Sequence, residues 1–599
     1  MNPRTPSPTR WALVLACAGV CAAPALLAAE AAGDDIAEIV VTAEKTSAPL
    51  SKIPISISAV SGEALQDQHI TDYEGLSRAV PNLSFSSFGG PGQSNIEIRG
   101  VSSQAGSATT GIYLDDVPIN ILNIYTAGAT EPRFFDLDRV EVLRGPQGTI
   151  YGSSSMGGTV HFVSNVPDLS KFSGSVHSSL GGTQGGSING EFDGVLNLPI
   201  VEGKAALRLG GLYEHESGWI DRNAAGLLVD KKINHVNTGV IRATLDWHPT
   251  ERLSVMPAVF LQRVNVGGQD LYGLSLPEFQ SPTLLPEKSR DEYAITSLTL
   301  KYDLGWSDLT SISGYFWRRN DRDIDGTFYD SEYVGFLLDQ TYGFGGGAIA
   351  ALPAPVQFNT NVNQFHQELR LASKPGGADD PWSWIGGLYY SRARTGLLDN
   401  EYIPGFNATV QSVYNDTPLN LLGAEFPNDL IYYAFTEFVN TQKAAFGQVN
   451  YRPIPAVKLT AGVRYEKASE ELGFDSRGFF ASGAPYSGSA SGSKVTPRFS
   501  VAYELGKTLL YASAAEGFRD GGINRPVPVP LCSDDLTSLG FSGSPPSYAA
   551  DSLWSYELGA KTRALGERLS LSGAVFDIRW NNIQTDIILP TCTFDIKAN

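Results

Sequence analysis

The sequence predicts a large antiparallel β-barrel of the outer-membrane type, preceded by a small mixed α/β domain. Three observations support this fold class. The chain begins with an export signal, and from about residue 172 it consists of alternating segments separated by turns. The connections between those segments are alternately short and long, as in barrels that have short turns on one rim and long loops on the other.

Residues 1–31 are predicted to be a secretory signal. Two arginines precede an alanine-rich apolar core, which ends in Ala29-Glu30-Ala31, a candidate cleavage site. A membrane anchor is the alternative, and the small residues at the end of the segment disfavour it. Two of the four cysteines lie inside this segment and would be removed with it.

Composition narrows the class of protein. With 599 residues, the chain is longer than one ordinary domain. It contains 63 glycines and 53 tyrosines and phenylalanines (25 Tyr and 28 Phe), which indicates a protein rich in strands and turns. Past residue 30 no apolar run reaches the roughly 20 residues of a spanning helix. The net charge of −19 argues against nucleic acid as a partner.

A polar tail, residues 32–48, contains a short β-rich run. The run reads EIVVTA, from Glu38 through Ile39, Val40, Val41 and Thr42 to Ala43. A short β-branched segment near a free terminus suits addition to the sheet edge of a partner, where main-chain hydrogen bonds give affinity. The alternative is an ordinary first strand of the domain that follows.

Residues 49–166 are predicted to form the small α/β domain. Residues 53–60 alternate as a strand, and two short helices begin at the caps Ser61 and Asp72. Further strands are expected at NIEIRG, residues 95–100, and at GIYLDDVPI, residues 111–119.

The glycine-rich stretch 136–164 is the most specific part of the sequence. It reads DLDRVEVLRGPQGTIYGSSSMGGTVHFVS, in which a strand at 139–143, a sharp turn and a second strand at 159–163 are expected. A phosphate-binding loop fits poorly, since no Gly-Lys-Ser/Thr follows and no long helix begins there. The remaining reading from composition alone is a glycine-rich hairpin.

The order of the residues in this stretch is more specific than their composition. RVEVLRGPQGTIYG followed by GG-x-V-x-F-V-S closely resembles the end of the plug domain in TonB-dependent outer-membrane receptors, although Met156 stands where that family usually has a small residue. NIEIRG and YLDDVPI also resemble plug motifs, in the family's order, and EIVVTA resembles the TonB box. The resemblance implies a plug at 49–166 inside the lumen of a barrel that occupies residues 170–599.

The barrel segments alternate in the way that lipid-facing strands require. In Lys458–Glu466, Leu459, Ala461, Val463 and Tyr465 face one way and the polar side chains face the other. A soluble sandwich or propeller also alternates, but it would need neither the export signal nor the uneven connections. The long connections are expected at 265–288, 323–360, 397–441, 471–493 and 519–550.

About fifteen strands can be counted up to Gln584, whereas plugged transporters close with about 22. The sequence ends at Asn599, in what should be an extracellular loop and without a terminal aromatic strand. We therefore expect the sequence to be a fragment that lacks about seven strands.

The resemblance also assigns a contact between plug and barrel. In similar receptors, arginines at the positions of Arg99 and Arg144 pair with two barrel glutamates, and Glu557 matches the first of them. The second would lie beyond Asn599. A guanidinium fork holds carboxylates bidentately, which suits a contact that must break or shift when the plug moves. The alternative is that each arginine forms an ordinary local pair.

Cys532 and Cys592 are the only cysteines of the mature chain. The expected topology places them in adjacent extracellular loops, and an exported protein passes through an oxidising compartment. We expect a disulfide between them; two free thiols are the alternative.

No catalytic constellation is found. The seven histidines are scattered without metal-ligand spacing, and no serine lies in a nucleophile elbow. We therefore expect no enzyme activity, no cofactor and no bound metal. The resemblance implies TonB-dependent transport across the outer membrane, with TonB, outer-membrane lipid and a small-molecule ligand as partners. The commonest ligand of such families is an iron chelate, a ferric siderophore; cobalamin, haem or a saccharide are alternatives. A passive porin or an adhesin is the rival from another class.

Overall fold

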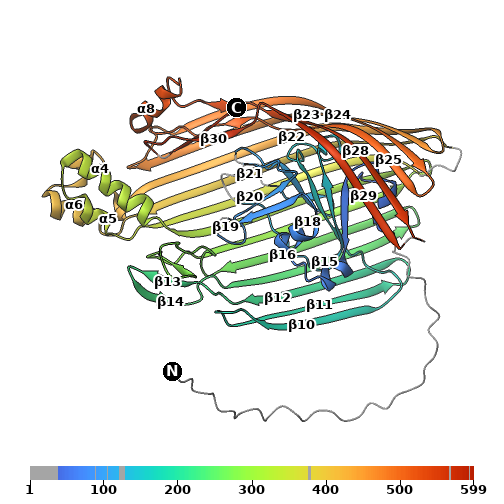
Figure 1. Ribbon diagram of the computed structural model, residues 1–599, viewed down its shortest axis with the longest axis horizontal. Coiled ribbons are helices and arrows are strands. Elements are labelled where there is room, and N and C mark those ends of the chain that lie inside the picture. Colours follow the sequence, from blue (N-terminus) through green and yellow to red (C-terminus); the bar gives the residue numbers. More distant parts are fainter. Residues whose placement is uncertain are drawn as a thin grey trace, which may run out of the picture.

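The structure, a computed structural model, describes residues 38–599 except 88, 104, 121–127, 375–379, 566–567 and 593. The predicted signal at 1–31 lies outside the described residues. A small N-terminal domain lies against the inner, concave face of one large curled sheet (Figure 1).

The N-terminal domain is mixed α/β, as predicted. Its main sheet has the order β3-β8-β9-β6-β7, in which only the β6–β9 pair is parallel. A separate hairpin joins β4 and β5, and another joins β1 and β2. The elements are β1 (Val40–Val41), β2 (Ala48–Pro49), η1 (Leu50–Lys52), β3 (Ile57–Ser61), α1 (Gly62–Asp67), α2 (Tyr73–Ala79), β4 (Leu83–Ser87), β5 (Ser94–Ile98), β6 (Thr110–Leu114), β7 (Val117–Pro118), β8 (Leu137–Arg144), α3 (Gly148–Tyr151) and β9 (Gly158–Ser164).

Local sequence explains where the two helices begin and end. Ser61 Oγ accepts a hydrogen bond from the Ala64 amide at 3.2 Å, and Asp72 Oδ1 accepts one from the Gly75 amide at 2.8 Å. Each cap satisfies an amide that has no partner inside its helix, so both predicted caps are confirmed. Helix α2 ends at Ala79, because the residue before Pro81 is disfavoured in helical conformation.

The large sheet contains fifteen antiparallel strands, the number expected from the sequence. Neighbours in the sheet follow chain order from β10 to β29, which form its two edges. The strands are β10 (Ser173–Gly182), β11 (Ile188–Val201), β12 (Ala205–Glu216), β15 (Val236–Thr250), β16 (Leu253–Val266), β18 (Ser289–Asp303), β19 (Ser307–Asp325), β20 (Pro355–Ser373), β21 (Trp382–Tyr402), β22 (Leu430–Ile454), β23 (Val457–Gly478), β24 (Tyr486–Leu505), β25 (Thr508–Arg519), β28 (Asp551–Ala564) and β29 (Leu569–Asn581).

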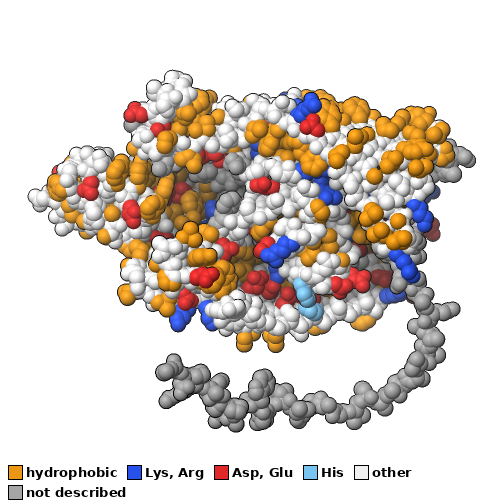
Figure 2. All heavy atoms as spheres, in the orientation of Figure 1, with side chains coloured by type: hydrophobic (Ala, Val, Ile, Leu, Met, Phe, Trp, Pro, Cys, Tyr) orange, Lys and Arg blue, Asp and Glu red, His pale blue; other side chains and the backbone are white. Residues whose placement is uncertain are grey.

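Strand β23 shows the predicted alternation. Val463 and Tyr465 are 50% and 52% exposed on the outer face, whereas Arg464 and Glu466 are buried toward the N-terminal domain. Figure 2 shows apolar side chains gathered on the outside of the sheet, over the strands at the upper right. An apolar outer face and a polar inner face are what a lipid-embedded barrel requires. Among the described helices, none has the length and apolar character needed to cross a membrane.

The two rims of the sheet differ, as expected. Short turns join β11 to β12, β22 to β23 and β24 to β25, whereas the other rim carries long connections. Those connections contain helices that the sequence analysis did not predict, and strands such as β22 extend well into the stretch expected to be a loop. They hold β13 (Asp221–Ala224), β14 (Leu227–Asp230), β17 (Gln280–Ser281), η2 (Thr327–Ser331), α4 (Glu332–Tyr342), α5 (Gly346–Ala350), α6 (Phe406–Tyr414), α7 (Pro418–Leu422), η3 (Pro427–Asp429), β26 (Gly522–Ile523), α8 (Val529–Ser538), β27 (Ser547–Tyr548), β30 (Thr585–Ile588) and β31 (Asp595–Ala598).

These loop helices pack on one another around an apolar cluster. Val334 of α4, Ile349 of α5, Phe406 of α6 and Phe480 are each buried in it. The long rim therefore carries a packed layer rather than separate loops, and Figure 1 shows α4, α5 and α6 projecting together beyond the strand ends.

Candidate functional site

The N-terminal segment Glu38–Ala43 is docked, not free. Val40 and Val41 form β1 and pair with β2, while the side chains of Val41 and Ala43 are buried. The Thr42 amide donates to Glu141 Oε1 of β8 at 2.8 Å. Strand addition to a partner would therefore require this segment to leave its own hairpin first.

The two residues after this segment contact the barrel with opposite charges. Glu44 accepts a hydrogen bond from Arg498 of β24 at 2.8 Å, and Lys45 lies 2.5 Å from Glu368 of β20. All four side chains are at most 6% exposed. Truncating one member of such a pair leaves the other charge buried without a partner, which costs about 3–5 kcal/mol.

Two sets of polar contacts hold the chain at Thr42 and at Lys45. Thr42, inside the segment, contacts Glu141, which lies beside His161 of β9. Asp116, in the β6–β7 turn, is paired with Arg370 of β20 at 3.0 Å, and Arg370 also contacts Glu368 at 3.1 Å. Lys45, just after the segment, contacts that same Glu368.

One carboxyl group and one imidazole group near Thr42, those of Glu141 and His161, have shifted pKa values. Burial alone would raise the pKa of Glu141, but the imidazole of His161, whose Nδ1 lies 3.5 Å from Glu141 Oε2, and the Thr42 amide outweigh burial, so the pKa falls below its usual range. Burial likewise opposes the charged form of His161, yet the nearby carboxylate of Glu141 raises its pKa above the ordinary value. Both shifts favour the charged pair that supports the Thr42 contact.

This docked segment lies at the rim with the short turns. Lys52 pairs with Glu504, next to the β24–β25 turn, and Lys561 of β28 donates to the Leu50 carbonyl at 3.0 Å. Beside the segment, a cavity of about 1050 Å³ lies between the domain and the barrel wall, with Thr42, Lys45 and Arg370 among its lining residues.

Arg99 and Arg144, predicted to act together, have different partners. Arg99 forms an ion pair with Glu557 of β28, and its guanidinium lies 4.0 Å from the ring centre of Phe576. Glu557 also accepts from Tyr511 Oη at 2.6 Å and from the Ser56 amide at 3.1 Å. The carboxylate is thus fixed between the domain and two barrel strands.

Arg144 differs from the prediction. Its Nη1 donates to the Pro81 carbonyl at 3.2 Å, and no ion pair joins it to Glu557 among the described residues. Burial and the nearby positive charge of Arg99 lower the pKa of Arg144, whereas the charge of Glu557 opposes that shift. Because Glu557 is already paired with Arg99, Arg144 donates to a neutral carbonyl instead.

The glycine-rich stretch places the domain against the barrel wall. Gly152 has φ +84°, and a Cβ at this position would lie 2.7 Å from Arg464 Nη2, so only glycine fits this approach. Met156, the departure from the motif, is fully buried in a cluster with Val101 and Leu553 of β28. The larger side chain therefore fills space between the domain and the wall.

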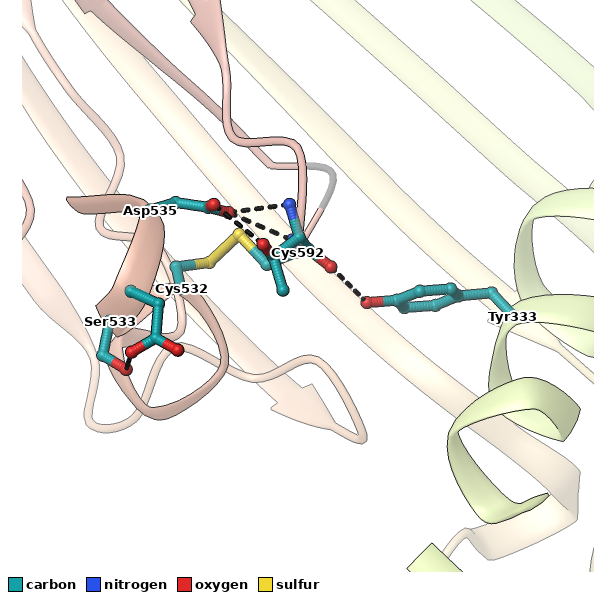
Figure 3. The surroundings of a disulfide bond; sticks show 7 residues. Tyr333, Cys532, Ser533, Asp535 and Cys592 are labelled. Carbon is teal, nitrogen blue, oxygen red and sulfur yellow. Dashed lines mark hydrogen bonds between the residues drawn. A yellow bond between two sulfur atoms is a disulfide. The ribbon is translucent and has the colours of Figure 1, made fainter. Parts of the chain in front are cut away.

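At the opposite rim, Cys532 of α8 and Cys592 are joined in a disulfide (Figure 3). Asp535 accepts hydrogen bonds from the amides of Thr591 and Cys592, at 2.8 and 3.3 Å. Tyr333 of α4 donates to the Thr591 carbonyl at 3.0 Å. The crosslink joins two consecutive long loops and ties them to a third through α4.

The comparisons with known proteins agree with this architecture. The family model described as TonB-dependent receptor plug domain matches residues 49–159. The model described as TonB dependent receptor-like, beta-barrel, matches residues 258–596, more than half of the chain. The chain belongs to the TonB-dependent receptor family. The N-terminal domain is its plug, and the protein resides in the outer membrane.

Similar receptors are known by sequence and by structure. The pesticin receptor of Yersinia pestis is 36% identical over 148 residues, 24% of this chain and 21% of that protein. The vitamin B12 transporter BtuB of Vibrio vulnificus is 32% identical over 130 residues, 22% of this chain and 20% of that protein. The aligned part of this receptor thus spans about a fifth of the curated relatives' length.

Among solved structures, the ferric yersiniabactin uptake receptor FyuA of Yersinia pestis has a TM-score of 0.68 at 20% identity, covering 89% of this chain and 73% of that one. The siderophore receptor PiuA of Acinetobacter baumannii has a TM-score of 0.64 at 17% identity, covering 92% and 75%. At these identities the likeness establishes the fold, and the named relatives are receptors and transporters.

Proposed function

We propose that this receptor actively takes up a scarce small-molecule nutrient, foremost a ferric siderophore. We further propose that Glu38–Ala43 is its TonB box, the segment that TonB binds and pulls to move the plug. The observation that carries the proposal is the docking of this segment at the short-turn rim, where it is joined by Glu44 and Lys45 to two barrel strands. A short strand that a partner grips by strand addition can transmit a pull to the plug through these contacts.

The contacts of Arg99 and Glu557 support the same function. This pair is buried between plug and barrel, so it holds the plug in place and must break or shift if the plug moves. A passive porin would need neither a plug fixed across its lumen nor a docked terminal strand. The relatives named for a ferric siderophore and for vitamin B12 support a metal-containing nutrient as the ligand class.

The test replaces residues 38–43 with a Gly–Ser segment of equal length in the complete protein. We expect energy-dependent uptake to be lost while ligand binding at the cell surface is retained, because the plug and the loops are unchanged. The control replaces the five residues 183–187, in the exposed turn between β10 and β11, with a Gly–Ser segment of equal length, which should leave uptake intact. Unchanged uptake in the first variant would point to passive diffusion and refute the proposal.

A further inference from the structure

A cavity of about 320 Å³ lies at the loop-facing end of the plug. Its floor is made by the plug, at residues 71–74, 87, 89–92 and 131–133, and its wall by the ends of β12, β15, β16 and β18. The long connections after β12 and β16 complete it. It therefore lies where a ligand that enters through the loops would first meet the plug.

The charged groups that line this cavity are almost all acidic. Arg133 is the one cationic side chain of the lining, against the carboxylates of Asp72, Glu74, Glu131, Glu216, Asp270 and Asp291.

Basic groups offset part of this excess, and Glu74 is paired with Arg78 on its own helix. The guanidinium of Arg133 is paired with Glu214 on the barrel wall, and it also lies 3.7 Å from Glu216 and 3.9 Å from Asp72. Asp291 is compensated by Arg318, at 2.7 and 2.9 Å. No basic group forms an ion pair with Glu131 or Asp270 among the described residues.

Two aromatic side chains that are only partly buried, Phe85 and Trp219, line the same cavity, and the buried ring of Tyr73 packs behind Phe85. Tyr73 and Phe85 are stacked with ring centres 6.3 Å apart, and Trp219 is held edge-on by Phe279 at 5.1 Å. The faces of such rings attract cations, and their combination with carboxylates is the chemistry by which proteins recognise ammonium groups.

The cavity also presents a polar group that no other part of the protein uses. Thr238 is 95% buried in the wall, and its hydroxyl makes no hydrogen bond among the described residues. Asn320 is 99% buried, and neither atom of its amide has a hydrogen-bond partner among the described residues, but it lies behind Gly92 and outside the cavity lining. Buried polar groups in native proteins are usually paired, so the hydroxyl of Thr238, which does line the cavity, is the group that a ligand would complete.

We propose that this cavity binds a positively charged group of the transported ligand, and that the receptor selects cationic over anionic small molecules. The inference rests on the proposed transport function and adds the charge class of its ligand. A protonated amine or a cationic metal complex would be held between the carboxylates and the aromatic faces. A polyanionic chelate of the same size would meet uncompensated carboxylates and be excluded.

The test uses two octahedral cobalt(III) complexes of opposite charge and similar size, the hexaammine trication and the hexacyanide trianion. Each is titrated calorimetrically into the full chain in detergent at low ionic strength. We expect saturable binding of the trication and no binding of the trianion. The triple variant E131Q/E216Q/D270N should weaken trication binding at least tenfold. These substitutions remove charge and keep side-chain volume.

A matched control separates the site from the general acidity of the protein. The triple variant E332Q/E425Q/D534N removes three exposed carboxylates from the extracellular loops, away from the cavity. It should bind the trication as the unmodified chain does. Equal weakening in both triple variants, or binding of the trianion, would overturn the proposal.

The result is independent of the transport proposal. Loss of uptake on replacing residues 38–43 concerns coupling alone, and calorimetry on the purified chain concerns the cavity alone. If the protein needs residues 38–43 for uptake but binds the trianion, the transport proposal stands and the charge selectivity is refuted. If it binds the trication but takes up nutrients without residues 38–43, the charge selectivity stands and the transport proposal is refuted.

Discussion

The two ends of the plug differ in whether their charged side chains are paired with the barrel. At the short-turn end, carboxylates and basic groups are paired between plug and barrel: Glu44 with Arg498, Lys45 with Glu368, and Asp116 with Arg370. At the loop-facing end, carboxylates line a cavity with a single guanidinium among them.

This difference distinguishes charges that hold the plug in the barrel from charges that can bind a ligand. A buried charge with its partner on the other unit fixes the plug, and it can pair again after a movement. A carboxylate that faces a cavity without an ion-pair partner, such as Glu131, makes no charge pair between plug and barrel, so its charge is available to a ligand that enters the cavity. The three following predictions test this contrast, and the first has the largest expected effect.

Removing the carboxylate of Glu44 should release the N-terminal segment. In Glu44→Ala, Arg498 would remain buried without its partner, at a cost of about 3–5 kcal/mol. The segment would undock to relieve that cost, so amide hydrogen exchange in residues 38–45 should accelerate by about 100-fold or more. Glu38→Ala is the control in the same segment, because Glu38 is exposed and, among the described residues, its carboxylate is hydrogen-bonded to Ser51 and to no basic group. Equal exchange rates in the two variants would mean that the paired charges do not hold the segment.

The pair of Arg99 and Glu557 should give a smaller effect. Glu557→Gln removes the negative charge but keeps an amide oxygen that can accept from Tyr511 and Ser56, so we expect a loss of about 1–3 kcal/mol in plug–barrel stability. The denaturation midpoint of the complete protein in urea measures it. The neighbouring Arg144→Gln should have less effect, since its guanidinium donates to a neutral carbonyl. A larger loss in Arg144→Gln than in Glu557→Gln would reverse the assignment of the contact.

Much of the fold follows from local sequence, because its causes are local. The alternation in Lys458–Glu466 predicts which side chains face lipid, and Ser61 and Asp72 predict the helix starts, since a cap contacts amides only three residues away. The plug motifs predict the plug, as the family match to residues 49–159 confirms.

The sites could be predicted only in part, because their residues meet through strand register and folding of distant segments. Nothing near Arg144 in the sequence indicates that its acceptor is the Pro81 carbonyl. The scattered histidines gave no metal-ligand spacing, yet the β10–β11 register brings His177, Glu191 and Asp193 within 4.8 Å of one another. Residues as far apart in the sequence as Asp72 and Asp291 contribute carboxylates to the loop-facing cavity, so no local motif could predict it.

The last prediction concerns the pH at which the cavity binds a cation. Burial raises the pKa of Glu131 to about 7, against the hydrogen bonds from Ser94 and the Gly92 amide; the charge of Asp291 also raises it and that of Arg318 lowers it. Below pH 7 the carboxyl is mostly protonated and neutral, and above pH 7 it is negatively charged. Affinity for hexaamminecobalt(III) should therefore increase as the pH rises, by up to about tenfold between pH 6 and pH 8.

Glu131→Gln should remove most of that increase, because its amide is neutral throughout this range. The same titration of Glu332→Gln, in an exposed loop carboxylate, should retain it. If Glu131→Gln keeps the full pH dependence, another group in the cavity is responsible, and Asp270, whose pKa burial also raises, becomes the next residue to replace. If the unmodified protein shows no pH dependence at all, Glu131 does not face the bound cation, and the contrast between the two ends of the plug must rest on the remaining carboxylates.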